Sequence, residues 1–439
     1  MGDLDLAFDS LLIVSLFATT TSFCGFKRSN TTYTIDEYTV GGVADKVFIY
    51  CNTYTLDFVL DEITKKTVSS LFKEYYKSFA PNVGSIERRE FGFGDFEKKV
   101  SFRHCSFADS AALRRYLYDN APTFVNYSIS LYKDPAARPM ENKGWLGAEL
   151  VFDLDAGDLH LECQKRHGHA WVCTNCMDMV KAETMKLIED FLIPDFGFSG
   201  NELSVNFSGN RGYHVHADKK ALYQLTQKER RAITEYIAGI NVHIETFFPT
   251  IGQKGKPLIG PKPADYGWGG RLARAMVKTL NGGTEPLQSL GIDQRTAKKL
   301  VANKADFIFG ITTGNWDKIP IPKKAEFWEG VMKRMAISQG DSIDKNVTND
   351  IYHLIRMPDT LHGDSGLVGK SVSISELASF DPLVKAIAFR KGSLSVVART
   401  TEALVINNET YGPYNGEVVE LPVYAALYLL LKRTATLSK

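Results

Sequence analysis

The feature that most constrains this chain is a pair of aspartates at the end of a short apolar run. The run ends at Phe152 and leads into Asp153-Leu154-Asp155, a pattern that predicts a buried β-strand. Side chains at positions i and i+2 of a strand lie on the same face, so the two carboxylates are expected side by side. Paired carboxylates bind hard divalent cations, and two such cations can assist phosphoryl transfer. An Asp-x-Asp pattern alone is a weak signal, because most such pairs are ordinary exposed strand ends.

A strand–turn–strand pattern follows later in the chain. Residues 203–207 alternate between apolar and polar types, and residues 213–216 predict a return strand. The turn between them is Ser208-Gly209-Asn210-Arg211-Gly212, whose glycines let the backbone approach a ligand closely. Ser208, Arg211 and His214 can all donate hydrogen bonds to phosphate oxygens. The alternative is an ordinary hairpin with an exposed arginine and a hydrogen-bonded histidine.

Between these two patterns lies a cluster of soft metal ligands. Cys163, His169, Cys173 and Cys176 have the spacing C-x5-H-x3-C-x2-C. Three thiolates and one imidazole suit tetrahedral Zn²⁺, and four protein ligands predict a structural site with no position for water. His167 is an alternative fourth ligand. Three free cysteines in a loop are the alternative to a metal site.

In their order along the chain, the motifs resemble the small catalytic subunit of the archaeal and eukaryotic DNA primase, and the archaeal form most closely. The resemblance runs from about residue 67 to the C-terminus. It rests on Glu87–Phe93, Phe102–His104, Lys143–Asp155, the turn leading to His214, and His353–Gly363. Several motifs in the family's order are far more specific than any one of them.

The resemblance implies a mixed α/β (α+β) fold. The expected fold is a primase-type catalytic core of antiparallel sheet flanked by helices, with a zinc knuckle and a helical insertion. Periodicity alone supports only an α/β or α+β fold with an insertion. The expected segments are an extension outside the resemblance (1–66), the first half of the catalytic core (67–222, knuckle 160–178), the helical insertion (223–338), and the second half of the core with the final helix (339–439).

The resemblance also implies roles for residues near the C-terminal end of the chain. Asp344 is expected to join Asp153 and Asp155 in holding catalytic Mg²⁺ or Mn²⁺, with Asp341 and Asp350 as alternatives. The incoming triphosphate is expected to be held by Ser208, Arg211, His214, Arg356 and His362.

Three positions depart from the family pattern. Thr360 replaces the usual serine and keeps its hydroxyl, whereas Asn210 replaces a second arginine seen in some relatives. Asp364 stands where archaeal relatives often have lysine.

The function implied by the resemblance is DNA-templated synthesis of short primers on single-stranded DNA from nucleoside triphosphates. Archaeal small subunits usually work as a heterodimer with a large subunit that carries an iron–sulfur cluster. This chain has no second cysteine cluster for such a cofactor, which favours the two-subunit interpretation. The expected location is cytoplasmic and nucleoid-associated. The alternatives are a stand-alone primase-polymerase or repair polymerase, a non-catalytic zinc-containing nucleic-acid-binding protein, and a metal-dependent phosphohydrolase.

Composition sets outer limits on these interpretations. The formal net charge is +1, so contacts with nucleic acid must come from local patches. Three of the six cysteines cluster, which suits a reducing compartment, and no apolar run reaches the ~18 residues of a membrane helix. Residues 1–66 are either an accessory segment or a start-site artefact, since no methionine lies between Met1 and Met140.

Local patterns predict several further features. Helices are expected over residues 178–192 and 349–356, and a final helix is expected from about Pro422. Arg88, Arg89 and Arg103 are candidates for phosphate or template contact, with a solvated charged face as the alternative.

Overall fold

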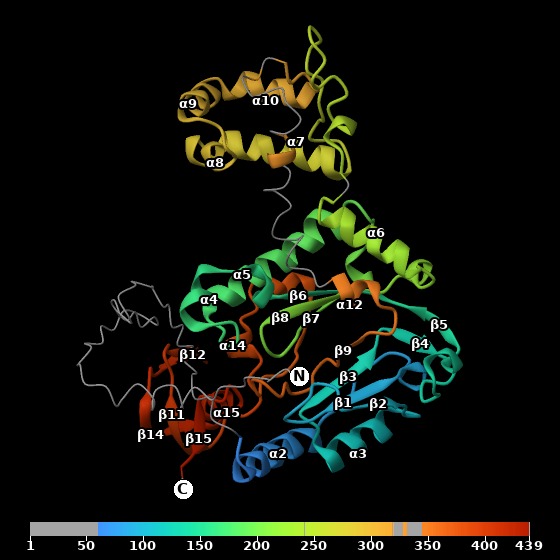
Figure 1. Cartoon of the computed structure of the whole chain (residues 1–439), viewed down its shortest axis with the longest axis vertical. Coiled ribbons are helices and arrows are strands. Elements are labelled where there is room, and N and C mark those ends of the chain that lie inside the picture. Colours follow the sequence, from blue (N-terminus) through green and yellow to red (C-terminus); the bar gives the residue numbers. More distant parts are fainter. Residues whose placement is uncertain (1–59, 241, 318, 320–327, 332–344, 439) are drawn as a thin grey trace, which may run out of the picture. The chain divides into compact units, whose positions relative to one another are not determined.

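The computed structural model describes residues 60–438, apart from 241, 318, 320–327 and 332–344 (Figure 1). Residues 58–439 form one compact unit, and the described elements all belong to it. Residues 1–59 of the expected extension lie outside the described residues. Its last residues, 62–66, form the first turns of helix α2 (Glu62–Lys77). None of the described helices combines the length and apolar character needed to cross a lipid bilayer.

The first sheet contains four antiparallel strands in the order β2-β1-β3-β9. Their bounds are β1 (Phe91–Gly94), β2 (Phe102–Cys105), β3 (Phe124–Ser128) and β9 (Leu354–Arg356). Helices α2 and α3 (Ser110–Asn120) share one hydrophobic core with this sheet. In α2, Val68, Phe72 and Tyr76 recur every four residues and are buried, so one helical face packs on that core.

The second sheet, also antiparallel, has the order β10-β7-β8-β6. Its strands are β6 (Leu150–Asp155), β7 (Leu203–Phe207), β8 (Gly212–Ala217) and β10 (Ser371–Val372). Helix α5 (Thr174–Lys186) lies against β6 and β8. The helix continues as a π-helical segment, η4 (Leu187–Leu192). Helix α5 begins at Thr174, before the start at residue 178 that the sequence predicts.

Strand β6 places its aspartates on the face that looks toward the first sheet. Alternate residues from Leu150 onward are buried in the core that includes α5. Val151 points the other way and packs into the core of the first sheet. Asp153 and Asp155 share the face of Val151, because side chains alternate along a strand. The Tyr127 ring of β3 stacks on His216 of β8, which joins the two sheets on this side.

Smaller elements complete the core. The remaining strands are β4 (Ser130–Tyr132), β5 (Trp145–Ala148), β11 (Ser393–Arg399), β12 (Leu404–Ile406), β13 (Glu409–Tyr411), β14 (Asn415–Pro422) and β15 (Ala435–Leu437). They form the pairs β4–β5 and β12–β13 and the sheet β14-β11-β15. The final helix α15 (Val423–Leu431) begins where Pro422 predicts, and every one of its residues is buried.

Longer helices occupy the expected insertion: α6 (Gln227–Ile237), α7 (Gly267–Asn281), α9 (Gln294–Ala302) and α10 (Lys304–Thr313). Arg271 of α7 is buried, forms an ion pair with Asp195, and lies 3.8 Å from the centre of the Phe191 ring. The short helical segments of the described chain are η1 (Ile86–Arg88), η2 (Met140–Lys143), η3 (Ala156–Leu159), α4 (Glu162–His167), η5 (Gly200–Glu202), η6 (Lys220–Leu222), η7 (Ile244–Thr246), α8 (Thr284–Ser289), α12 (Lys345–Asn349), α13 (Ile374–Leu377) and α14 (Pro382–Lys385).

The helix expected over residues 349–356 is wrong. Helix α12 ends at Asn349, and residues 354–356 form strand β9 instead. Arg356 pairs with Asn126 in the register of β9 and β3, so tertiary pairing overrides the local helical pattern. The result is that Arg356 lies on the sheet that faces the aspartates of β6.

Candidate nucleotide and metal site

Two carboxylates lie together at the end of β6, as their spacing predicts. The side chains of Asp153 and Asp155 are 25% and 33% exposed, so both are accessible to a ligand from solvent. Asp155 Oδ1 accepts a hydrogen bond from the backbone N–H of Gly157 at 2.7 Å and lies 2.6 Å from Arg211 Nε. This donor set fits hard divalent cations, which prefer carboxylate oxygens. Asp344 and Asp341 lie outside the described residues.

The turn between β7 and β8 sits beside these carboxylates. Ser208 Oγ accepts hydrogen bonds from the backbone N–H groups of Asn210 and Gly212 at 3.3 and 3.2 Å. Since its oxygen is used as an acceptor, the hydroxyl proton is left to donate outward. Gly209 has φ = 85°, and an added Cβ there would lie 2.9 Å from Cβ of His362. A glycine is therefore needed for the turn to approach the His362 segment so closely.

His214 is directly opposite Asp153 in the β6–β8 pairing. Its Nε2 lies 3.4 Å from Asp153 Oδ1, and its side chain is buried. Burial lowers the pKa of His214 well below its usual value, and the neighbouring His216 and Arg356 add to the shift. His214 is thus neutral near pH 7, and its Nδ1 has no hydrogen-bond partner among the described residues.

Arg356 and His362 reach the same place from the first sheet and the turn that follows it. Both are buried, and both contact the Phe124 ring: Cζ of Arg356 lies 5.0 Å from its centre, and the His362 ring is nearly perpendicular to it with the two ring centres 5.3 Å apart. His362 Nδ1 accepts a hydrogen bond from the backbone N–H of Asp364 at 3.0 Å. Neutral His362 therefore carries its proton on Nε2. Ser365 Oγ donates to the carbonyl of Gly209, which fastens this segment to the β7–β8 turn.

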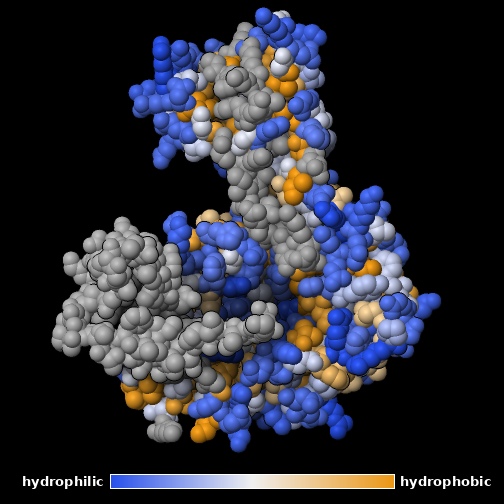
Figure 2. Space-filling model, in the orientation of Figure 1, coloured by the Kyte–Doolittle hydropathy of each residue, from blue (hydrophilic) through white to orange (hydrophobic). Residues whose placement is uncertain are grey.

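These contacts bring together all five residues expected to bind the triphosphate. Ser208, Arg211 and His214 come from one hairpin, whereas Arg356 and His362 come from a segment much later in the chain. Figure 2 shows hydrophilic side chains lining a hollow on the face where the β7–β8 turn lies in Figure 1.

A separate group of metal ligands lies between α4 and α5. The ligand atoms of Cys163, His167, Cys173 and Cys176 all lie within 4.8 Å of one another. Cys163 Sγ and Cys173 Sγ lie 3.5 and 3.7 Å from Cys176 Sγ. Those distances are close to the edge of about 3.8 Å expected for a tetrahedron with Zn–S bonds of about 2.3 Å, and much longer than a disulfide bond. The four residues fit a zinc ion.

The prediction of His169 as the fourth ligand is wrong, because this geometry places His167 there instead. His167 Nε2 lies 3.6 Å from Cys176 Sγ, whereas His169 is exposed and stands outside the group. The chain turns at Gly168 with φ = 73°, between the two histidines. His169 contributes in another way, because its carbonyl accepts a hydrogen bond from Arg211 at 2.6 Å.

The chain is similar in sequence to proteins of a known family. A sequence model of the family described as DNA primase small subunit matches residues 152–374. The DNA primase small subunit PriS of Methanococcoides burtonii is 34% identical over 396 residues, covering 86% of this chain and 99% of its own length. That of Methanothrix thermoacetophila is 32% identical over 403 residues, covering 85% and 98%.

The chain belongs to the DNA primase small subunit family. The PriS protein of Halobacterium salinarum, at 32% identity over 351 residues, is a further relative and covers 76% of this chain. The mixed α/β fold with antiparallel sheets flanked by helices and a Cys/His cluster confirms the fold that the resemblance implied.

Within this primase small subunit, all three candidate arginines have partners in the protein. Arg89 is buried and forms an ion pair with Glu149 at 2.8 Å. Arg103 Nε lies 2.8 Å from Glu90 Oε1. The side chain of Arg88 is 47% exposed; its Nε lies 4.0 Å from Glu87 Oε1, and its Nη1 lies 3.5 Å from the carbonyl of Lys133. Arg89 is held inside the fold by its ion pair, whereas the side chain of Arg103 is ion-paired and still 37% exposed.

One further residue contacts the β7–β8 turn without having been predicted from the sequence. Lys432, at the end of α15, places Nζ 2.8 Å from Oδ1 of Asn210 and 2.9 Å from the carbonyl of Ala170. The first of these lies in the β7–β8 turn and the second in the knuckle loop. No local pattern around Lys432 signals this, since the contact with Asn210 spans 222 positions of the chain.

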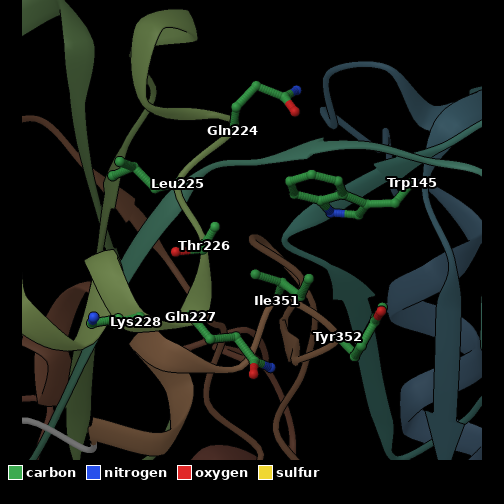
Figure 3. A pocket seen from close by; sticks show the side chains of 8 residues that line it. All are labelled: Trp145, Gln224, Leu225, Thr226, Gln227, Lys228, Ile351 and Tyr352. Atoms are coloured by element: carbon green, nitrogen blue, oxygen red, sulfur yellow. The ribbon is translucent and has the colours of Figure 1, made fainter.

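A cavity of about 380 Å³ lies away from the primase site (Figure 3). Trp145 and Tyr352 are on one side of it and Leu225 and Lys228 on the other. None of the predicted metal or nucleotide residues lines it, so it is separate from the site between the sheets.

Proposed function

We propose that this chain is the catalytic subunit of a DNA primase. It is a DNA-templated nucleotidyltransferase that synthesises short RNA primers on single-stranded DNA, with deoxynucleotides as alternative substrates. The observation that supports this most is the meeting of the Asp153–Asp155 pair with the two segments that carry Ser208, Arg211, His214, Arg356 and His362. That combination places cation-binding carboxylates beside donors suited to a triphosphate.

The residues divide the work by their chemistry. The hydroxyl of Ser208 and Nε2–H of His362 would donate hydrogen bonds to phosphate oxygens. The buried guanidinium of Arg356 would offset the negative charge of the phosphates. Arg211 has five N–H donors, so it can keep its contact with Asp155 and still bind an anion. Mg²⁺ or Mn²⁺ held by Asp153, Asp155 and Asp344 would lower the pKa of the attacking hydroxyl and stabilise the charge of the transition state.

The partners proposed for this chain follow from the family. A primase large subunit with an iron–sulfur cluster would form a heterodimer with it, and the pair would act on single-stranded DNA in the cytoplasm at the nucleoid. Zn²⁺ at Cys163, His167, Cys173 and Cys176 would be structural, because all four positions of the tetrahedron are filled by protein.

The decisive experiment is primer synthesis by the purified chain on single-stranded DNA, with labelled nucleotides and Mg²⁺ or Mn²⁺. D153N and D155N serve as controls, since Asn keeps the side-chain shape and removes the charge. Template-dependent products that the controls lose support the proposal. Near-normal synthesis by either control would disprove the metal assignment. Products that form only when the large subunit is added indicate a two-subunit primase, whereas products formed without it indicate a stand-alone enzyme. No product even with that subunit would indicate a non-catalytic member of the family.

A further inference from the structure

The last helix of the chain brings a lysine to the nucleotide site. Lys432 follows α15 directly, and its ammonium group donates to Oδ1 of Asn210 and to the carbonyl of Ala170. An ammonium group has three N–H donors. Two of them are used by described residues, which leaves one for a ligand.

Lys432 is one of the cations that lie near His362. Within the described parts of the chain, neither Lys432 nor Arg356 forms an ion pair, and Nε of Arg356 has no hydrogen-bond partner. Their positive charges act on the buried His362 that lies near both. Buried cations are costly unless an anion compensates them. The buried Arg356 and the partly buried Lys432 both lie near a neutral hydrogen-bond donor, and together the three groups make a binding site for an anion.

The surroundings of Lys432 agree with this arrangement. Burial lowers the pKa of Lys432 to about 8. The carboxylates of Asp364 and Asp155 oppose the shift, whereas the charges of Arg211 and Lys99 add to it. At neutral pH the group still carries its charge, and it lies within electrostatic reach of the carboxylate that is proposed to hold metal.

We propose that Lys432 binds the phosphate groups of the incoming nucleoside triphosphate. This inference rests on the proposed function and assigns a residue outside the motifs to the same site. The third donor of Lys432 and the guanidinium of Arg356 approach the triphosphate from two different elements, the end of α15 and strand β9. Asp364 lies nearby and repels phosphate, so the added positive charge of Lys432 offsets that repulsion.

The alternative is a purely structural role, in which Lys432 only ties α15 to the turn and the knuckle loop. The variant N210A separates the two roles, because it removes the hydrogen bond to the turn and keeps the charge. A structural tie predicts that N210A weakens nucleotide binding as much as K432M does. A phosphate contact predicts that N210A binds nucleotide nearly as the wild type does.

The test is calorimetric binding of ATP and of inorganic tripolyphosphate, with Mg²⁺, to the full chain. We expect K432M to raise the dissociation constant for both ligands roughly tenfold, the usual effect of losing one charge-assisted hydrogen bond. The matched control is R433M, because Arg433 is the neighbouring cation, is exposed, and donates to the carbonyl of Phe96 at 3.4 Å. Affinity for a single-stranded oligothymidylate is measured in parallel and should not change.

Several outcomes overturn the inference. One is that K432M binds ATP as tightly as the wild type does. Another is that N210A or R433M loses as much affinity for ATP as K432M does. The third is that K432M loses affinity only for the oligothymidylate. A wild-type chain that binds neither ATP nor tripolyphosphate and makes no primers contradicts the proposed function itself. The two failures are therefore distinguishable.

Discussion

His362 shows how its surroundings fix the role of a single side chain. Burial lowers its pKa well below the usual value, and the positive charges of Arg356, Lys99 and Lys432 shift it in the same direction. The imidazole is therefore neutral over the physiological range. Because Nδ1 accepts from the backbone of Asp364, the single proton is presented by Nε2.

We predict that H362Q retains more activity than H362N. Gln places its amide N–H near the position of Nε2, whereas the shorter Asn reproduces only the Nδ1 end. The KM for nucleotide should rise by about tenfold or more in H362N, and by only a few fold in H362Q. Steady-state kinetics of primer synthesis measure this. H243Q is the control, since His243 is exposed in the helical insertion. Equal losses in H362N and H362Q would contradict donation from Nε2.

Glu149, directly before β6, is a second residue whose environment determines its behaviour. Burial alone would raise its pKa, but Arg89 and His216 lower it to about 2. Arg230 donates to the carbonyls of Ala148 and Glu149, which fixes the backbone at the start of the catalytic strand. The carboxylate of Glu149 contacts Arg89 at 2.8 Å and Nδ1 of His216 at 2.9 Å, so its charge ties the start of this strand to β8 and to Arg89.

We predict that Glu149 makes the fold sensitive to acid. A carboxyl group with a lowered pKa contributes stability above its unfolded pKa of about 4.5, and this stability is lost as the pH falls toward 2. The shift corresponds to a contribution on the order of 3 kcal/mol. E149Q should be destabilised at pH 7, and the gap between it and the wild type should narrow from pH 5 to pH 3. Urea unfolding across that range measures it, and a constant gap would contradict the assignment.

Among the elements, the α4–α5 knuckle depends on a detail of chain geometry. His167 is the last residue of α4, and the left-handed turn at Gly168 carries the following residues away from the thiols. We predict that H167A loses bound zinc after mild chelation and that H169A retains it. Zinc content by atomic absorption, with the melting temperature recorded alongside, decides between them. If H169A loses zinc and H167A retains it, the prediction is wrong and His169 is the fourth ligand, as the sequence spacing predicts.

The elements also show what local sequence can and cannot predict. The Asp153–Asp155 pair and the β7–β8 hairpin follow from period-two alternation and glycine chemistry, which act over a few residues. The choice between His167 and His169 depends on one backbone dihedral that ligand spacing does not encode. Residues 354–356 form strand β9 because they pair with β3, and local sequence could not predict this pairing because β3 lies far away in the chain. Lys432 was missed for the same reason, since only the packing of α15 brings it to the turn.

At the scale of the whole molecule, the site lies between two antiparallel sheets with separate hydrophobic cores. The first core joins α2, α3 and the first sheet, and the second joins α5, the second sheet and the helical insertion. Residues 58–439 form a compact unit that contains both cores.

We predict that a chain beginning at Phe58 folds and makes primers as the full chain does. Asp61 caps the first helix of this unit, so the cut leaves that cap in place. The melting temperature should stay within about 2 °C of the full chain, because no described core residue is removed. Differential scanning calorimetry and the primer assay test this. A clear loss of either property would show that residues 1–57 support the catalytic unit.

The position of α15 has a consequence for how the protein is made in the cell. Leu427 and Leu431 of this helix pack into the core of the first sheet, and Leu427 lies against Gly366 in the segment after His362. Translation delivers these residues after almost all the rest of the site has left the ribosome. A nascent chain therefore contains the aspartates and the β7–β8 hairpin early, but the His362 segment still lacks its packing contact with α15. Nucleotide binding should begin only after the last helix emerges, so interrupted translation products should be inactive on DNA.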